Sequence, residues 1–358
     1  MKCFVGIDQV LTMTGPRGDA SPERALGLIS DAAIICQSDG RVHWVGPRGD
    51  VPSGDYEYVD LDGVVVMPAL VEAHTHIVFA GDRTKDYAAR CAGESYEEVA
   101  RRGGGIRLTV QETRAASVDV LVNLALPRLE SLLAHGVTTV EIKSGYGLTL
   151  RDELKMLQAV KQLGMLGPWT VIPTLLAAHI VPDEFIHDRA GYISMVCDEL
   201  MPEVSRRSLA KYVDVFCDSG AFTLGETVHI LERAKALGFG LKAHAEQLSR
   251  TGASRAAARL GAHSVDHLEY LNDEDIEVLA EHGTCAVLLP GASLFLGMAA
   301  RPPARRLLDH GVPVVLSTDC NPGTCPSTHL PLMTTLGCSS LGMMPHEALL
   351  AITREAAI

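Results

Sequence analysis

The stretch VVVMPALVEAHTH (residues 64–76) decides the fold, because it reads as an apolar strand that ends in two histidines one residue apart. Seven further apolar stretches follow, separated by helical sequence: VTTVEIKS (137–144), WTVIPTLLAAH (169–179), VDVFC (213–217), GLKAHAE (240–246), HSVDHLEY (263–270), TCAVLLPG (284–291) and PVVLSTD (313–319). Mostly continuous apolar runs are typical of parallel strands that helices cover. Eight strand–helix units over roughly 250 residues predict an α/β fold of the TIM-type (β/α)8 barrel.

A doubly wound open sheet uses the same unit and is the main structural alternative. The phosphate-binding loops G-x-G-x-x-G after the first strand and G-x-x-x-x-G-K-[ST] do not occur in the sequence. Several helical stretches end on a glycine directly before a strand, at positions 136, 164, 238, 261, 283 and 311. Glycine in the left-handed conformation is a common helix C-cap. We therefore predict a barrel domain over residues 67–358.

Residues 1–66 predict a separate small β domain. AIICQ (33–37) and RVHWVG (41–46) flank Ser38-Asp39-Gly40, a turn sequence suited to a hairpin. The segment is too short to close a β-sandwich by itself. We therefore expect a small N-terminal β-sandwich domain that pairs with something later in the chain.

Composition narrows the class of protein. The net charge of −13 argues against a nucleic-acid surface, which needs clustered Lys and Arg. No apolar run approaches the roughly 20 residues of a membrane span, and the start of the chain lacks the pattern of a secretory signal. The nine cysteines are odd in number and irregular in spacing, which indicates reduced thiols and a cytoplasmic location.

The histidines sort by their place on the predicted strands. Active sites of these barrels lie at the C-terminal ends of the strands. Five of the fourteen histidines lie there, together with one aspartate: His74, His76, His179, His244, His267 and Asp319. His74 and His76 are two residues apart and so point to one face of a strand. Hydrogen-bonded core histidines are the competing interpretation, which five separate strand-end positions disfavour.

We predict one divalent metal ion held by His74, His76, His244 and Asp319. Three imidazoles and one carboxylate suit Zn²⁺ or Fe²⁺. Such a metal lowers the pKa of water to about 7 and polarises a carbonyl. Asp319 is then the expected proton acceptor and later donor, and His267 the expected hydrogen-bond donor to the developing oxyanion. The residues by themselves indicate hydrolysis or deamination at a planar carbon.

Longer motifs resemble one family of the amidohydrolase superfamily, the imidazolonepropionases. They are AHTHIVFAGDRTKDYAARCAGESYEEVARRGGGI (73–106), TTVEIKSGYGL (138–148), KAHAEQLS (242–249), VDHLEY (265–270), AVLLPGASLFL (286–296) and STDCNPGTCPST (317–328). The resemblance implies hydrolysis of the cyclic amide of 4-imidazolone-5-propanoate to N-formimidoyl-L-glutamate, a step of histidine degradation. It also implies a homodimer.

The resemblance further implies roles for single residues. Arg83 would bind the propionate carboxylate, for which a planar guanidinium is suited. Tyr146 and His179 would contact the imidazolone ring. Asn321, Gly323 and Thr324 would contact substrate or product. By residue type alone, Arg83 reads as a surface charge, Tyr146 as packing, the 321–324 segment as a simple turn and Lys143 as a structural ion pair.

Two departures from the family pattern matter. Position 247 is Gln, where some members have Glu. Glutamine can orient a substrate but cannot act as a base, so proton transfer falls to Asp319 or His267. The chain also ends at TREAAI, where the family continues with strands that complete the small domain. We therefore expect the sandwich to be incomplete and the chain to be a fragment.

Three functions remain open on the sequence. The first is imidazolonepropionase activity. The second is another amidohydrolase activity, on a different cyclic amide or as an aromatic deaminase. A ring substrate without a charge would not need Arg83 as a carboxylate partner, which separates these two. The third is an inactive, truncated barrel, against which the four intact metal ligands argue.

Overall fold

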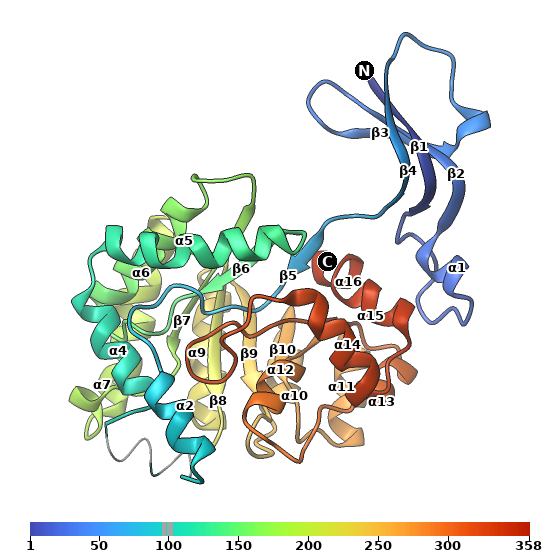
Figure 1. Ribbon diagram of the computed structural model, residues 1–358. Coiled ribbons are helices and arrows are strands. Elements are labelled where there is room, and N and C mark those ends of the chain that lie inside the picture. The colour runs from blue at the N-terminus through green and yellow to red at the C-terminus, as the bar shows by residue number, and fades with distance from the viewer. Residues whose placement is uncertain (95–97, 99–102) are drawn as a thin grey trace. The chain divides into compact units, whose positions relative to one another are not determined.

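A computed structural model describes residues 1–94, 98 and 103–358 (Figure 1). These residues form two compact units, one of Met1–Ala69 with Ala357–Ile358 and the other of Leu70–Ala356. Part of the motif at 73–106, namely residues 95–97 and 99–102, lies outside the described residues. In the described part of the chain, every helix is too short or too polar to cross a membrane.

The first unit is built on a four-stranded sheet with the order β3-β2-β1-β4. Its elements are β1 (Lys2–Leu11), α1 (Pro22–Leu26), β2 (Leu28–Cys36), β3 (Val42–Pro47), η1 (Arg48–Asp50) and β4 (Glu57–Val66). The predicted hairpin is confirmed, because β2 and β3 pair antiparallel with Ala33 opposite Gly46. The described strands of this unit form one sheet, which supplies a single layer of the predicted sandwich.

The second unit contains eight strands whose order in the sheet follows the sequence, as in a (β/α)8 barrel. They are β5 (Leu70–Glu72), β6 (Val137–Lys143), β7 (Thr170–Ala178), β8 (Tyr212–Cys217), β9 (Gly240–Ala245), β10 (Ser264–His267), β11 (Cys285–Leu288) and β12 (Val314–Leu316). Each neighbouring pair is parallel. A parallel bridge between Thr75 and Cys320 joins the first strand region to the last. The predicted barrel is confirmed.

The first barrel strand is shorter than the stretch 64–76 that predicted it. Val64–Val66 belong to β4 of the other unit, where Val65 pairs with Gln9. Pro68 separates β4 from β5; it has no N–H to donate to a sheet, so one continuous paired strand through it is disfavoured. His74 and His76 therefore lie in extended chain just beyond β5.

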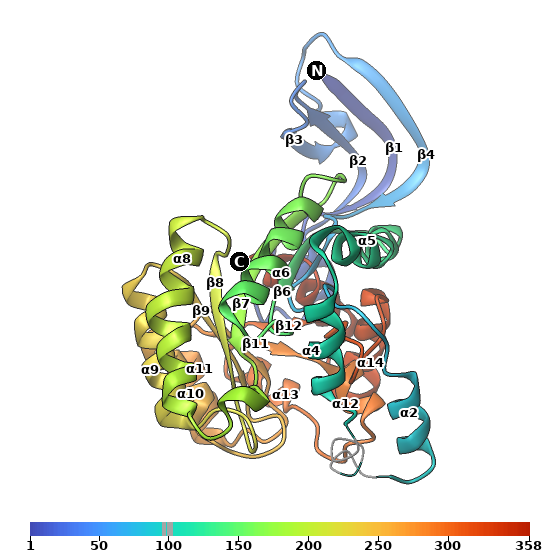
Figure 2. The ribbon, with the colours of Figure 1, turned by 90° about the vertical axis from the view of Figure 1, so that its left-hand side faces the viewer.

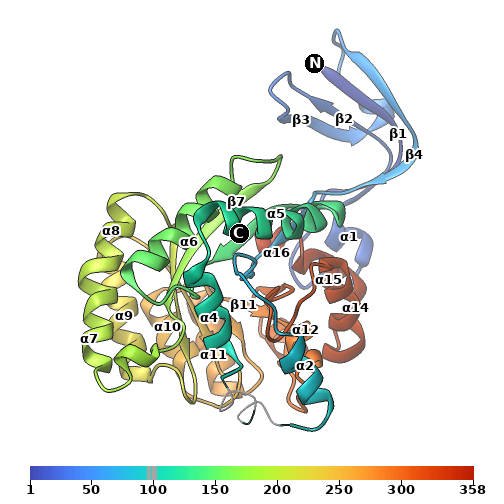
Figure 3. The ribbon, with the colours of Figure 1, turned by 60° about the vertical axis from the view of Figure 1, so that its left-hand side comes forward.

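Helices surround the strands (Figures 1 and 2). They are α2 (Thr84–Cys91), α4 (Ile106–Ala115), α5 (Val118–Ala134), α6 (Leu150–Leu163), η2 (Asp183–Phe185), α7 (Arg189–Ser194), η3 (Met195–Leu200), α8 (Met201–Arg206), α9 (Leu224–Ala236), α10 (Ala253–Leu260), α11 (Asp273–His282), α12 (Pro290–Phe295), α13 (Ala304–Asp309), α14 (Leu330–Leu341), α15 (Pro345–Ala351) and α16 (Arg354–Ala357). α9 and α10 pack against β8–β10, and α14 and α15 lie side by side against β12 (Figure 3).

The glycines predicted to end helices are confirmed with one exception. Gly261 and Gly283 are left-handed C-caps of α10 and α11. Gly164 caps α6 in the right-handed conformation, with φ −63°, so the predicted left-handed cap is wrong there. Met165 and Leu166 continue the turn after α6, with their N–H groups bonded to the carbonyls of Gln162 and Leu163. The chain therefore does not need a left-handed residue at Gly164.

The interior of the barrel is charged, which differs from the expected continuous apolar runs. Lys143 on β6 contacts Asp214 on β8 and Asp266 on β10, although these strands are not neighbours in the sheet. Such contacts place the three side chains inside the barrel. Their neighbours along the strands, such as Val215 after Asp214 and Val265 before Asp266, belong to the hydrophobic core. The strands therefore alternate between a charged inner face and an apolar outer face.

Leu157 on α6 tests this core, because its side chain is fully buried in it. We expect Leu157→Ala to lower the free energy of unfolding by about 2–5 kcal/mol, since it removes buried apolar surface and leaves a cavity. Leu166→Ala is the matched control, at a position 54% exposed, and should change it by less than about 0.5 kcal/mol. Urea denaturation measures both. Equal effects of the two substitutions would contradict the packing.

Candidate metal centre and active site

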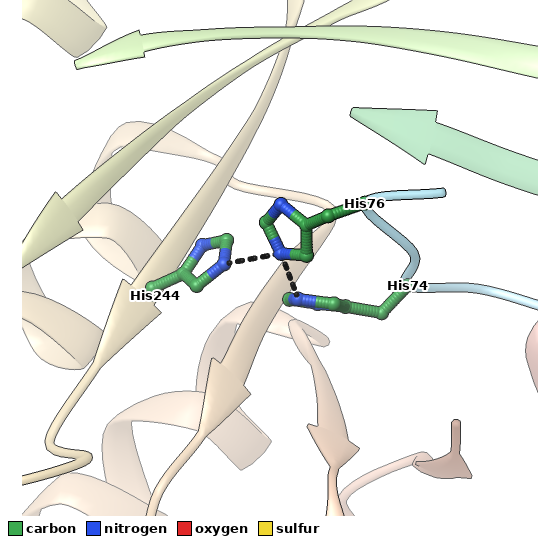
Figure 4. A group of neighbouring side chains, drawn as sticks. All are labelled: His74, His76 and His244. Atoms are coloured by element: carbon green, nitrogen blue, oxygen red, sulfur yellow. Dashed lines mark hydrogen bonds between the residues drawn. The ribbon is translucent and has the colours of Figure 1, made fainter. Parts of the chain in front are cut away.

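Three imidazoles meet at the C-terminal end of the barrel (Figure 4). Nε2 of His76 lies 3.2 Å from Nε2 of His74 and 3.5 Å from Nε2 of His244. His74 and His76 follow β5, and His244 lies near the end of β9. All three side chains are buried. The structure thus brings together three ring nitrogens from distant parts of the sequence.

Asp319, which follows β12, lies next to two of these imidazoles. Its Oδ1 lies 3.5 Å from Nε2 of both His74 and His76. Four ligands placed at about 2.0–2.1 Å around a tetrahedral Zn²⁺ are roughly 3.3 Å apart. The spacings of 3.2–3.5 Å match this geometry. In the described part of the chain, the ligand atoms of His74, His76 and His244 all lie within 4.8 Å of one another, so these three imidazoles fit a metal site, with Asp319 beside two of them.

Two buried aspartates orient the imidazoles. Nδ1 of His74 lies 2.6 Å from Asp266 Oδ2, and Nδ1 of His244 lies 3.0 Å from Asp214 Oδ1. An ionised carboxylate can only accept a hydrogen bond, so we infer that Nδ1 of each of these two rings carries the proton and that Nε2 is bare. Two bare nitrogens turned toward a common centre are suited to bind a cation. The donor set thus fits a metal ion by chemistry as well as by distance.

A network of ion pairs joins these aspartates. Lys143 Nζ lies 2.7 Å from Asp214 Oδ2 and 2.9 Å from Glu141 Oε1. Lys242 Nζ lies 3.2 Å from the same Glu141 oxygen. The interpretation of Lys143 as a structural ion pair is confirmed. Burial opposes the charged form of Lys143, but the carboxylates of Asp214 and Glu141 outweigh it and raise its pKa.

Burial sets the protonation of the metal-binding side chains. It lowers the pKa of His74, His76 and His244 well below the ordinary value. It raises the pKa of the Asp319 carboxyl to about 8. Without a cation, the site therefore favours neutral imidazoles and a neutral carboxyl. Burial disfavours every charged form here, so the protonation state without a cation is neutral at all four side chains.

Three further predicted residues lie around the imidazoles. The His267 ring is 5.3 Å from that of His244, centroid to centroid, and its Nδ1 has no hydrogen-bond partner in the described part of the chain. His179 stacks on His76, with 5.4 Å between centroids, and its Nδ1 lies 3.0 Å from the carbonyl of Gly145. The Tyr146 ring is 5.6 Å from that of His179. Burial lowers the pKa of both His179 and His267 to about 4.

Arg83 and Gly323 lie beside each other. A Cβ placed on Gly323 would be 3.3 Å from Nη1 of Arg83, so glycine leaves room for the guanidinium. The Arg83 side chain is only 7% exposed, and its Nε donates to Asp86, which also accepts the N–H of Gly105. The competing interpretation of Arg83 as an ordinary surface charge is therefore disfavoured, because this guanidinium is buried.

The turn after Asp319 is held by its own side chains. Asn321 Nδ2 donates to the carbonyl of Asp319 and to Thr324 Oγ1, while its Oδ1 accepts the N–H groups of Gly323 and Thr324. Thr324 Oγ1 in turn lies 3.3 Å from Asp319 Oδ2. In this structure Asn321 and Thr324 thus orient the Asp319 carboxylate. Gln247 is buried just after β9, at the same end of the barrel.

Three buried glutamates, which the sequence analysis missed, bind backbone N–H groups of segments that follow the barrel strands. Glu72 accepts the N–H groups of His74 and Thr318. Glu153 accepts those of Gly145, Gly147 and Leu148, in the loop of Tyr146. Glu246 accepts those of Gly252, Ala253 and Ser254, at the start of α10. Of the three, only Glu72 and Glu246 had a sequence signal, since each lies two residues from a predicted metal ligand.

Backbone strain gathers at the same end of the barrel. Asp319, His267 and Glu246 have φ of 55°, 80° and 52°, a region that side chains other than glycine seldom adopt. Such conformations persist where the surrounding structure fixes them, and they cluster at functional sites. The strain supports an active site here.

The comparisons with known proteins agree with this geometry. Residues 65–358 match the amidohydrolase family. The crystal structure of 5-methylcytosine deaminase from Klebsiella pneumoniae has a TM-score of 0.72 at 16% identity, covering 99% of this chain and 85% of that one. The fold and the site therefore define a member of the amidohydrolase family.

Closer relatives refine the class. The imidazolonepropionase of Symbiobacterium thermophilum is 45% identical over 99% of this chain and 84% of its own length. That of Paracoccus denitrificans is 48% identical over 92% of this chain and 83% of its own length. The chain belongs to the imidazolonepropionases, hydrolases of carbon–nitrogen bonds in cyclic amides.

The raised pKa of Asp319 predicts how the stability of the metal-free protein depends on pH. The ordinary pKa of Asp is about 3.9, so above it the unfolded chain releases a proton that the folded state keeps until about pH 8. The stability from Asp319 therefore falls as pH rises. The buried histidines act oppositely, but only below about pH 6.5, where unfolded imidazoles are charged.

We expect the melting temperature of the metal-free protein to fall between about pH 6.5 and pH 8, and to fall less steeply in Asp319→Asn. Thermal unfolding in the presence of a chelator measures both slopes. Identical slopes in the two proteins would show that Asp319 does not carry the effect.

Proposed function

We propose that this chain hydrolyses 4-imidazolone-5-propanoate to N-formimidoyl-L-glutamate, the reaction expected from its membership of the imidazolonepropionases. Water adds to the ring carbonyl carbon, the bond from this carbon to the ring nitrogen breaks, and the nitrogen takes up a proton. The observation that supports this most is the convergence of three imidazoles and Asp319 at the mouth of the barrel, with buried Arg83 beside the same turn.

His74, His76, His244 and Asp319 would hold one Zn²⁺ or Fe ion. Bound in this site, the metal supplies Lewis acidity: it lowers the pKa of water to about 7 and polarises a carbonyl oxygen. The nitrogen-rich donor set would favour these borderline metals over Mg²⁺ or Ca²⁺, which prefer six or more oxygen ligands.

Asp319 would transfer the protons, and His267 would stabilise the charge that develops on the carbonyl oxygen. Asp319 accepts a proton from the attacking water and returns it to the leaving nitrogen. Its second oxygen, Oδ2, lies near Thr324 Oγ1, so the carboxylate is oriented while it does so. His267 donates a hydrogen bond to the oxyanion that develops on the carbonyl. Gln247 can orient the substrate, but its amide does not act as a base.

Other side chains would bind the substrate. Arg83 pairs with the propionate carboxylate, and Gly323 leaves the space for its guanidinium. Tyr146 and His179 lie against His76 and would contact the ring. Asn321 and Thr324 would act chiefly by shaping the turn, as their hydrogen bonds indicate.

The metal ligands are tested by metal affinity. We expect the wild type to bind one Zn²⁺ or Fe ion per chain. We expect His74→Ala to weaken this binding by over 100-fold, because loss of a ligand should cost more than the roughly 10- to 100-fold typical of a residue that only supports a ligand. His282→Ala, at an exposed histidine that ends α11, is the control and should bind metal as the wild type does. Elemental analysis and competition with a chelator measure both. Retention of metal by His74→Ala would contradict the site.

Arg83 is tested by steady-state kinetics. Loss of a charge-assisted hydrogen bond costs about 1.5–3 kcal/mol, so we expect Arg83→Ala to raise KM for imidazolone propionate roughly 10- to 100-fold. The turnover number should change much less, because the bond is made in both ground and transition states. Arg107→Ala, which breaks an exposed pair with Asp183, is the matched control. An unchanged KM would contradict the carboxylate contact, and a metal-loaded wild type without turnover would contradict the proposed reaction.

A further inference from the structure

Lys143 is one of the largest fully buried side chains of the protein, and it lies directly behind the metal-binding imidazoles. Its Nζ is 2.7 Å from Asp214 and 3.5 Å from Asp266. These are the same carboxylates that accept the Nδ1 protons of His244 and His74. One ammonium group therefore joins both imidazole–carboxylate pairs across the interior of the barrel.

We infer that Lys143 is a positioning residue for the metal centre, which acts by fixing Asp214 and Asp266 and through them the imidazoles of His244 and His74. The inference rests on the metal centre proposed above. It adds a residue on β6, a strand that contributes none of the four ligands.

The contacts leave each carboxylate little freedom. Asp214 faces Lys143 with Oδ2 and His244 with Oδ1, so the carboxylate cannot turn without losing one partner. Asp266 faces His74 and Lys143 with Oδ2, while its Oδ1 accepts the hydroxyl of Ser264 at 2.6 Å. Without Lys143, two buried carboxylates would lose a charged partner, and their positions would relax.

Lys242 is a matched comparison inside the same barrel. Its ammonium lies 3.1 Å from the carbonyl of Ala73 and 3.2 Å from Glu141, but 3.9 Å from Asp266. The ion pairs of the described residues include none between Lys242 and Asp214. Lys242 thus shares the charge and the environment of Lys143 without the bridging position.

The sign of the effect separates positioning from plain electrostatics. The carboxyl groups of Glu141, Asp214, Asp266 and Asp319 are buried in the same region as the ammonium groups of Lys143 and Lys242. Removal of one ammonium makes this region more negative, which by Coulomb's law alone strengthens the binding of a divalent cation. A loss of positioning weakens binding instead, typically 10- to 100-fold for a residue that supports metal ligands.

The experiment is a chelator competition with Zn²⁺ on the wild type, Lys143→Met and Lys242→Met. We expect Lys143→Met to raise the Kd for Zn²⁺ roughly 10- to 100-fold. Lys242→Met should leave it within about threefold of the wild type or lower it, as charge alone predicts. Unchanged or tighter binding by folded Lys143→Met overturns the inference, and so does an equal loss in both variants.

A charge-neutral pair covers the case in which Lys143→Met does not fold. The double variant Lys143→Met/Glu141→Gln removes one positive and one negative charge that contact each other. It should bind Zn²⁺ at least tenfold more weakly than Glu141→Gln alone, because the bridge between Asp214 and Asp266 is lost. Equal binding by these two proteins overturns the inference.

A last measurement uses only the wild type. In the metal-free protein, ¹⁵N NMR should show His74 and His244 each in one tautomer, with the proton on Nδ1. A mixture of tautomers overturns the inference. Failure of the wild type itself to bind Zn²⁺ or iron would instead remove the proposed metal centre, so the two outcomes are distinct.

Discussion

The hydrogen bonds from two imidazoles to Asp214 and Asp266 are the interactions on which the rest of the site depends. Each bond fixes the proton on Nδ1 and so turns a bare Nε2 toward the same point. The carboxylates are fully buried, which is costly unless charged partners compensate them. Lys143 contacts both carboxylates and supplies that compensation, so the barrel interior can hold charges where an apolar core would be expected.

A second set of buried carboxylates serves the loops rather than the metal. Glu72, Glu153 and Glu246 each accept two or more backbone N–H groups, those of Glu72 and Glu153 from segments that carry site residues and those of Glu246 from the start of α10. Loops held this way have little conformational freedom left to lose when substrate binds, and such preorganisation favours catalysis. Glu72 accepts the N–H of Thr318, directly before Asp319, and Asp319 and Glu246 both have positive φ, a conformation that persists where the surrounding structure fixes it.

The scaffold itself does not set the reaction. A deaminase of a pyrimidine base shares this fold at low sequence identity. Because one fold supports different reactions, the loops at the mouth of the barrel must determine which substrate is bound. In this chain those loops bring a buried arginine, Arg83, next to the turn after Asp319. A guanidinium there suits a small ring substrate that carries a carboxylate, in line with the imidazolonepropionase relatives.

The sequence by itself determined the repeating strand–helix order and which side chains lie at the strand ends, because both are local patterns. These two patterns were enough to predict His74, His76, His244 and Asp319 as metal ligands. It missed Asp214 and Asp266, although the alternation in VDVF and SVDH marked them as facing away from the apolar residues. It also extended the first strand through Pro68. Only the tertiary structure decided which partner each imidazole has, because His74 and Asp266 are 192 residues apart and meet only when the barrel forms.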